Sequence, residues 1–149
     1  MSECVTCALV ARRDRGEAPP WDRILRTDHW DVVHAFGTSL EGWLVLVVRR
    51  HITAVSALSE AEADELGPLI KRASAAIQEV VDCDKTYVAQ FAEHPDHPHV
   101  HVHVIPRRRD LSDEHKGPRV FDLIGVAEQE TVPGARMDEI ATAIRARLA

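Results

Sequence analysis

Three histidines alternate with valines over residues 99–103, and this alternation constrains the fold more than any other feature of the chain. Strict alternation of two residue types is the signature of a β-strand, in which residues two apart point to the same face. We therefore expect a strand over 99–105. His99, His101 and His103 should line one of its faces, and the valines should be buried on the other.

The remaining periodicity predicts an α+β fold. Ser59 and Glu62 form the pattern of a capping box, which marks the start of a long helix over 59–81. Gly67-Pro68 should kink this helix or shift its start. Because tight turns join most neighbouring strands, we expect an antiparallel sheet with the helices on one side. The other expected elements are strands at 30–36, 43–48 and 85–93, a short helix or turn and then a loop over 8–28, a basic loop over 106–118, and a C-terminal helix over 136–148.

Composition narrows the function classes. The chain has 149 residues, a formal net charge of −6, 45% hydrophobic residues and 28% charged residues, the balance of one globular domain. Proteins that grip long nucleic acids are usually basic, so we expect no nucleic-acid polymer as a partner, and any bound phosphate should belong to a small molecule. No stretch approaches the roughly 18 apolar residues of a membrane span. The first residues show no secretory signal, and an odd cysteine count suggests no disulfide framework. We therefore expect a cytoplasmic protein without membrane contact.

The histidine row admits three interpretations. A histidine-rich surface strand is one, but three imidazoles in a row are costly without partners. A single metal ion held by all three is another, but His99 and His103 would have Cα atoms roughly 13 Å apart in a strand, whereas zinc needs nitrogen ligands at about 2 Å. Nucleophilic catalysis by His101 is the third, and we favour it.

Imidazole suits a nucleophilic role because it is mostly neutral near neutral pH. One ring nitrogen directs a lone pair at the substrate, while the other donates its proton to a fixed acceptor. A neighbouring histidine can protonate a leaving group or donate to a phosphoryl oxygen. Basic residues after the strand make a phosphoryl electrophile plausible, although the same residues can equally form a solvated loop. They are Arg107, Arg108, Arg109, Lys116 and Arg119.

Residues 99–107 resemble the signature of the histidine triad (HIT) family, in which three histidines alternate with apolar residues and Pro-Arg often follows. Residues 42–51 resemble the family's upstream strand, often Pro-Gly-His-x-Leu-Val with a Pro-Lys-x-His ending. Cys4-Val5-Thr6-Cys7 resembles the N-terminal Cys-x-x-Cys of many members. The similarity covers about residues 4–110 of a single domain spanning 1–149, and the extension 111–149 resembles nothing we can place.

This resemblance implies a five-stranded antiparallel sheet with a long helix, usually paired into a homodimer. It also implies a hydrolase or nucleotidyltransferase that acts at the α-phosphate of a nucleotide conjugate, such as a phosphoramidate or a dinucleoside polyphosphate. The middle histidine, here His101, would form a nucleotidyl-histidine intermediate that water or another acceptor, such as phosphate, resolves. We expect His99 and His103 to be catalytic as well. The residues expected to bind the substrate are Arg107, Trp43 and Gln90.

Several positions depart from the family pattern. Pro95 stands where many family hydrolases have glutamine, and Trp43 stands where the family has a histidine near the nucleotide. The loop over 91–98 is rebuilt and contains His94 and His97. These changes leave His101 intact, but they favour an alternative function, a nucleotide-binding or sensing module with weak or no turnover.

Cys4 and Cys7 have the spacing of half a zinc site. A redox pair is one rival, but such a motif should follow a strand and open a helix. Two unligated thiols are another. The family resemblance suggests His51 and His99 as the remaining ligands of a structural zinc, and the sequence leaves His94 and His97 as alternatives. A zinc-stabilised interaction protein is therefore a third functional hypothesis, and Cys83 is expected to be a buried thiol.

The long helix carries small residues beside its apolar stripe, namely Ala63, Ala75 and Ala76. Small residues let a partner approach closely, and the edges of a five-stranded sheet need covering. Two-fold dimers are the commonest oligomers. These features, with the resemblance, favour a homodimer, although alanine also simply favours helix.

Overall fold

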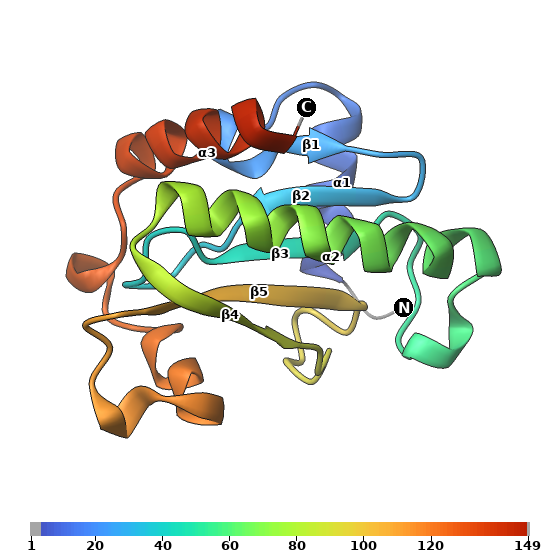
Figure 1. Cartoon of the computed structure of the whole chain (residues 1–149). Helices are drawn as coiled ribbons and strands as arrows, with labels where there is room; N and C mark the ends of the chain where they lie inside the picture. Colours follow the sequence, from blue (N-terminus) through green and yellow to red (C-terminus); the bar gives the residue numbers. More distant parts are fainter. Residues whose placement is uncertain (1–3, 149) are drawn as a thin grey trace.

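A five-stranded antiparallel sheet organises the protein, as the computed structural model shows for residues 4–148 (Figure 1). The strand order is β1-β2-β3-β5-β4, and every neighbouring pair is antiparallel. This sheet, the long helix and the C-terminal helix confirm the predicted fold class. The strands are β1 (Leu25–Arg26), β2 (Trp30–His34), β3 (Leu44–Val48), β4 (Cys83–Ala89) and β5 (His101–Arg108), and the α-helices are α1 (Val5–Asp14), α2 (Glu60–Val80) and α3 (Gly134–Leu148).

Strand β5 is shifted along the sequence relative to the prediction. It begins at His101 rather than at residue 99, because the Val100 N–H donates to the Ile52 carbonyl instead of to a strand. It then continues to Arg108, through the start of the expected basic loop. Pro106 is tolerated inside the strand because pairing with β3 ends at Val104, so only β4 pairs with β5 beyond that point.

The two faces of the sheet are covered differently. The main core packs the valines of β5, with Leu44, Leu46 and Val48 of β3, against α2 and α3. On the opposite face, Val10 of α1 packs near Val45 and Val47. In Figure 1, α2 and α3 lie in front of the sheet and α1 lies behind it. The expectation of helices on one side is therefore correct for α2 and α3 and wrong for α1, whose weak periodicity did not predict a packed helix.

Helix α2 begins with the predicted capping box, in which Ser59 accepts from the Glu62 N–H and the Glu62 carboxylate accepts from the Ser59 N–H. The helix runs unbroken through Pro68, which lies on its exposed face. Ala76 belongs to the buried stripe, so its expected place beside that stripe is wrong, whereas Ala63 and Ala75 are exposed. No helix among residues 4–148 is long and apolar enough to cross a membrane.

The C-terminal extension returns across the sheet face that carries α1. A 3-10 helix, Gly117–Leu123, is tied to the turn after β2 by hydrogen bonds from the Ser39 N–H and the Thr38 hydroxyl to the Leu123 carbonyl. Two further short turns flank this helix, at Asp113–His115 and Glu128–Glu130. The extension therefore helps to enclose the space above β3 and β5. The remaining 3-10 turns are Pro20–Asp22 and Val55–Ala57.

Candidate functional site

A cavity of about 640 Å³ opens on the sheet face opposite α2. His101 and His103 of β5 form part of its floor, beside Val45 and Val47 of β3, and the pairing of these two strands places each histidine opposite one of the valines. The walls come from α1, from the loop after β4 and from the C-terminal extension. Most of the lining side chains are apolar, and three phenylalanines are among them: Phe36, Phe91 and Phe121.

His101 is held by the backbone beside it. Its Nδ1 lies 2.6 Å from the His99 carbonyl oxygen. A carbonyl only accepts hydrogen bonds, so Nδ1 carries the proton and Nε2 carries a lone pair. Burial lowers the pKa of His101 below its ordinary value, which keeps the ring neutral. The side chain therefore offers an unprotonated nitrogen at the cavity.

His103 lies beside it, with ring centroids 5.0 Å apart. The Trp43 indole Nε1–H donates to the Nδ1 of His103 over 3.0 Å, and Phe121 meets the His103 ring edge-on. Burial, with a smaller contribution from His101, lowers the pKa of His103 to about 3. This ring is also neutral near neutral pH.

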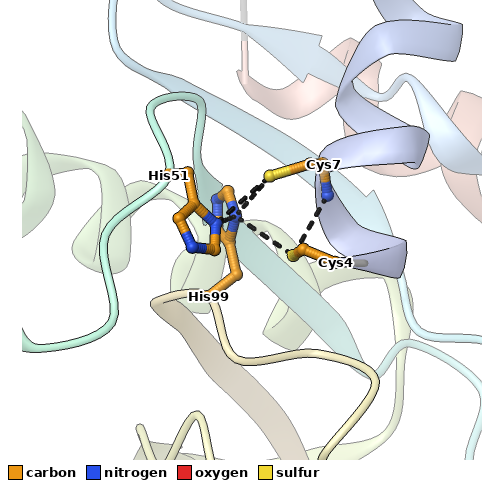
Figure 2. Close-up of side chains that lie close together, drawn as sticks. All are labelled: Cys4, Cys7, His51 and His99. Carbon is orange, nitrogen blue, oxygen red and sulfur yellow. Dashed lines mark hydrogen bonds between the residues drawn. The ribbon is translucent and has the colours of Figure 1, made fainter. Parts of the chain in front are cut away.

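His99 does not line the cavity with the other two histidines, which corrects the expected single row. It precedes β5 and is fully buried, and its Nε2 lies 2.6 Å from the Val48 carbonyl oxygen. Its Nδ1 faces Cys4, Cys7 and His51 instead. Figure 2 shows the two cysteines at the start of α1 converging with His51 and His99 from the other side.

These four side chains form a compact cluster whose ligand atoms all lie within 4.8 Å of one another. The His99 Nδ1 is 3.7 Å from the Cys4 Sγ and 3.5 Å from the Cys7 Sγ, and the His51 Nδ1 is 3.2 Å from both the Cys7 Sγ and the His99 Nδ1. Tetrahedral zinc with its usual bond lengths would place sulfur and nitrogen ligands roughly 3.5 Å apart and two nitrogens roughly 3.3 Å apart. The cluster therefore has the dimensions of a zinc site.

The protonation states of the side chains in this cluster also suit the binding of a cation. Because the His99 Nε2 faces a carbonyl, that nitrogen carries the proton and Nδ1 is a free lone pair. Without a cation, burial and the neighbouring Cys4 raise the pKa of Cys7 to about 11, so its thiol stays protonated. A divalent ion would displace that proton and separate the two facing imidazole nitrogens.

The loop between β4 and β5 brings two more histidines to the cavity rather than to the cysteine cluster. The His97 Nδ1 hydrogen-bonds the Thr6 hydroxyl over 2.8 Å, and the Val5 N–H donates to the Asp96 carbonyl over 2.8 Å. His94 and His97 both line the cavity. The structure thus favours His51 and His99 over these alternative ligands, and it ties the loop to the start of α1.

The residues expected to bind the substrate lie around the cavity rather than in its lining. Arg107 forms an ion pair with Asp84 at 3.0 Å. Trp43 is fully buried behind His103, and Gln90 directly follows β4. Other basic residues of the expected phosphate-binding group are also paired with acids, as in Arg108–Asp110, Arg109–Asp82 and Lys116–Asp113. Their pairing matches the alternative of a solvated surface.

Sequence reasoning missed several cavity residues. Buried His34 lines the cavity with both nitrogens occupied, since Nδ1 donates to the Ala35 carbonyl and Nε2 accepts from the Gly42 N–H. Arg13 of α1 lines it too, paired with Asp22 at 2.9 Å and Asp31 at 3.1 Å. Phe121 comes from the extension, where no motif signalled a role. A histidine inside a predicted strand was the one available signal, at His34.

Comparisons with known proteins agree with this architecture. The family model described as HIT domain matches residues 19–110. Among solved structures, a histidine triad protein from Bradyrhizobium japonicum has 23% identity and a TM-score of 0.70, covering 85% of this chain and 90% of that one. A hypothetical histidine triad nucleotide-binding protein from Sulfolobus tokodaii has 16% identity and a TM-score of 0.70, with coverages of 95% and 91%.

A zinc-bound histidine triad family protein from Mycobacterium smegmatis has 20% identity and a TM-score of 0.65, covering 97% of this chain and 92% of that one. At these identities the likenesses establish the fold. No curated protein matches the sequence.

Proposed function

The chain belongs to the HIT domain family, and from that membership and the geometry of its cavity we propose that it is a nucleotide-processing enzyme. It would cleave a nucleotide conjugate at the α-phosphate, as a hydrolase or nucleotidyltransferase, through a nucleotidyl-histidine intermediate on His101. The observation that carries the proposal is the hydrogen bond from the His101 Nδ1 to the His99 carbonyl, which leaves Nε2 unprotonated at the cavity.

The chemistry follows from that lone pair. The His101 Nε2 attacks the α-phosphorus, and the bond from phosphorus to the leaving group breaks with its electron pair on the leaving group. Water or a phosphate acceptor then attacks the same phosphorus, and the nitrogen–phosphorus bond returns its pair to His101. His103 would donate a hydrogen bond to a phosphoryl oxygen during both steps. The role of His99 is indirect, since its carbonyl orients His101 and its own ring faces the cysteines.

The apolar walls suit the base of a nucleotide. Phe36 and Phe91 are 48% and 56% exposed at the cavity, and both offer ring surface on which a base can stack. Suitable conjugates are phosphoramidates and dinucleoside polyphosphates. The alternative, a nucleotide-binding module with weak turnover, is favoured by Arg107, whose charge is engaged by Asp84 rather than directed into the cavity.

A nucleotide panel scored for release of nucleoside monophosphate tests the proposal. We expect turnover of at least one conjugate, trapping of a nucleotidylated protein in an alkaline denaturing quench, and a loss of at least about 10³-fold in kcat for His101→Ala. His115→Ala is the matched control, because His115 bonds Ser112 in the extension and does not line the cavity. Tight nucleotide binding without any turnover would support the binding module instead, and wild-type turnover by His101→Ala would overturn the mechanism.

We also propose that Cys4, Cys7, His51 and His99 hold one structural zinc ion. When bound, the ion would neutralise the cysteine thiolates and brace the start of α1 against the chain leading into β5. Elemental analysis of protein purified without added metal should find about one zinc per chain. Cys7→Ser should lose most of it, whereas Cys83→Ala, at a buried thiol outside the cluster, should retain it. Metal-free wild-type protein with freely titrating thiols would exclude the site.

The small-molecule substrate and the acidic net charge together argue against a nucleic-acid polymer as partner. We further propose a cytoplasmic location, because that compartment keeps unpaired thiols reduced.

A further inference from the structure

Trp43 is fully buried, and its indole N–H makes the one hydrogen bond that the structure describes for the His103 ring. An indole N–H donates and has no lone pair with which to accept. The Nδ1 of His103 must therefore be the acceptor. Its proton then belongs to Nε2, the ring nitrogen on the other side.

His101 has the opposite arrangement. Its Nδ1 donates to the His99 carbonyl, so its Nε2 is bare. Two neighbouring histidines on one strand face are thus held in opposite tautomers by two different partners, a carbonyl that only accepts and an indole that only donates. One ring presents a lone pair, and the other presents an N–H.

We propose that Trp43 is a positioning residue, which fixes His103 as a neutral Nε2–H donor directed at the cavity beside the lone pair of His101. The value of that donor to catalysis rests on the function proposed above, but the tautomer itself does not.

The surroundings of His103 support a ring that stays neutral. Trp43 and Phe121 both meet it edge-on, at centroid distances of 5.7 Å and 5.0 Å, and Val45 lies opposite it on β3. The ionisable ring of His101 meets it edge-on, at a centroid distance of 5.0 Å. A second proton on Nδ1 would break the bond to Trp43 and would charge a ring that is 8% exposed. Both costs favour the single Nε2–H tautomer.

A consequence follows for the chemistry. A neutral imidazole can relay a proton only if its second nitrogen receives one, and an indole cannot supply it. His103 can therefore donate a hydrogen bond to a phosphoryl oxygen throughout the reaction, but it does not deliver its proton to a leaving group. Any proton that the leaving group needs has to come from water or from another side chain at the cavity, such as His97.

Heteronuclear NMR of the imidazole nitrogens in the wild-type protein tests the tautomer without any substrate. We expect a protonated Nε2 and a bare Nδ1 for His103, the reverse for His101, and a scalar coupling between the Trp43 indole nitrogen and the His103 Nδ1. A proton on the His103 Nδ1 would overturn the proposal whether or not the protein turns over nucleotides. So would an indole N–H of Trp43 that exchanges freely with solvent.

Substitution separates positioning from packing. Trp43→Phe keeps a buried ring but removes the N–H, so the His103 nitrogen signals should move toward averaged values. Phe121→Leu removes the other aromatic contact and should leave the tautomer unchanged. If the nucleotide panel shows turnover, Trp43→Phe should lower kcat about 10-fold with little change in KM, because the donor remains but loses its orientation. An unchanged kcat together with an unchanged tautomer in Trp43→Phe would refute the positioning role and leave the nucleophile untouched.

Discussion

Replacing Arg13 by Met should cost the protein far more stability than the same change at Arg12. The Arg13 side chain is 4% exposed and donates to Asp22 at 2.9 Å and to Asp31 at 3.1 Å, and its Nε donates to the Asp22 carbonyl. Arg12 also pairs with Asp22, at 2.5 Å, but it is 33% exposed. Methionine preserves much of the buried stem in both variants and removes only the charged head.

The magnitude follows from what each change leaves behind. Removing one partner of a buried ion pair typically costs about 3–5 kcal/mol, because the other charge stays buried and unpaired. Asp22 keeps Arg12, and Asp31 keeps Arg26 at 2.6 Å, so we expect the lower end, about 3 kcal/mol. The more exposed pair of Arg12 should contribute about 1 kcal/mol or less.

Urea unfolding, monitored by tryptophan fluorescence on protein of equal metal content, measures both losses. With a slope of about 2 kcal/mol/M, Arg13→Met should lower the midpoint by roughly 1.5 M and Arg12→Met by at most about 0.5 M. Equal losses in the two variants would show that burial of the Arg13 charge does not anchor α1, and the reasoning would fail.

Three further outcomes are expected. Gly42→Ala should lower the free energy of unfolding by about 2–3 kcal/mol, because Gly42 has a φ of +88° and a Cβ there would lie 2.5 Å from the Val81 Cγ2. A loss below about 1 kcal/mol in urea unfolding would contradict this. The hydrogen bond from Arg50 lowers the pKa of Glu62 from 4.5 to about 2. The stability that the Glu62 carboxylate confers is therefore complete above pH 4.5 and is lost as the pH falls toward 2. In a pH series of urea midpoints, Glu62→Gln should reduce the loss of stability over this range. We expect a two-fold homodimer that covers the outer edge of β4, where Val88 is 49% exposed. A monomer mass of 16.6 kDa in sedimentation near micromolar concentration would exclude this dimer.

Local sequence patterns were sufficient to predict the strands and helices that have a regular periodicity or a clear cap. The alternation of histidine with valine located β5 to within two residues at its start, and the capping box located α2. Alternation could not show that the chain leaves the sheet at Val100, because that depends on a hydrogen bond to Ile52, in a segment remote in sequence. His99 consequently faces the cysteines rather than the cavity.

Ion pairs between residues far apart in the sequence could not be predicted from the sequence either. A run of arginines after the strand suggested phosphate contacts, yet Arg107 and Arg109 are both paired with Asp84 of the neighbouring strand. Only the register of β4 against β5 brings these groups together. The hydrogen bond from Trp43 to the ring of His103 was likewise not predicted, because it joins side chains far apart in the sequence. The sequence pattern predicted that His101 and His103 share a face, and both line the cavity, but it did not predict the partners that orient their rings.

The 3-10 helix at 117–123 lies beyond the residues that the family model matches, yet it places Phe121 against His103 and Pro118 in the cavity wall. The cavity is therefore formed partly by a segment that lies outside the residues carrying the histidine triad signature. This segment contributes no strand to the five-stranded sheet. Substitutions at Pro118 or Phe121 should therefore change the shape of the cavity while leaving His101 and His103 in place.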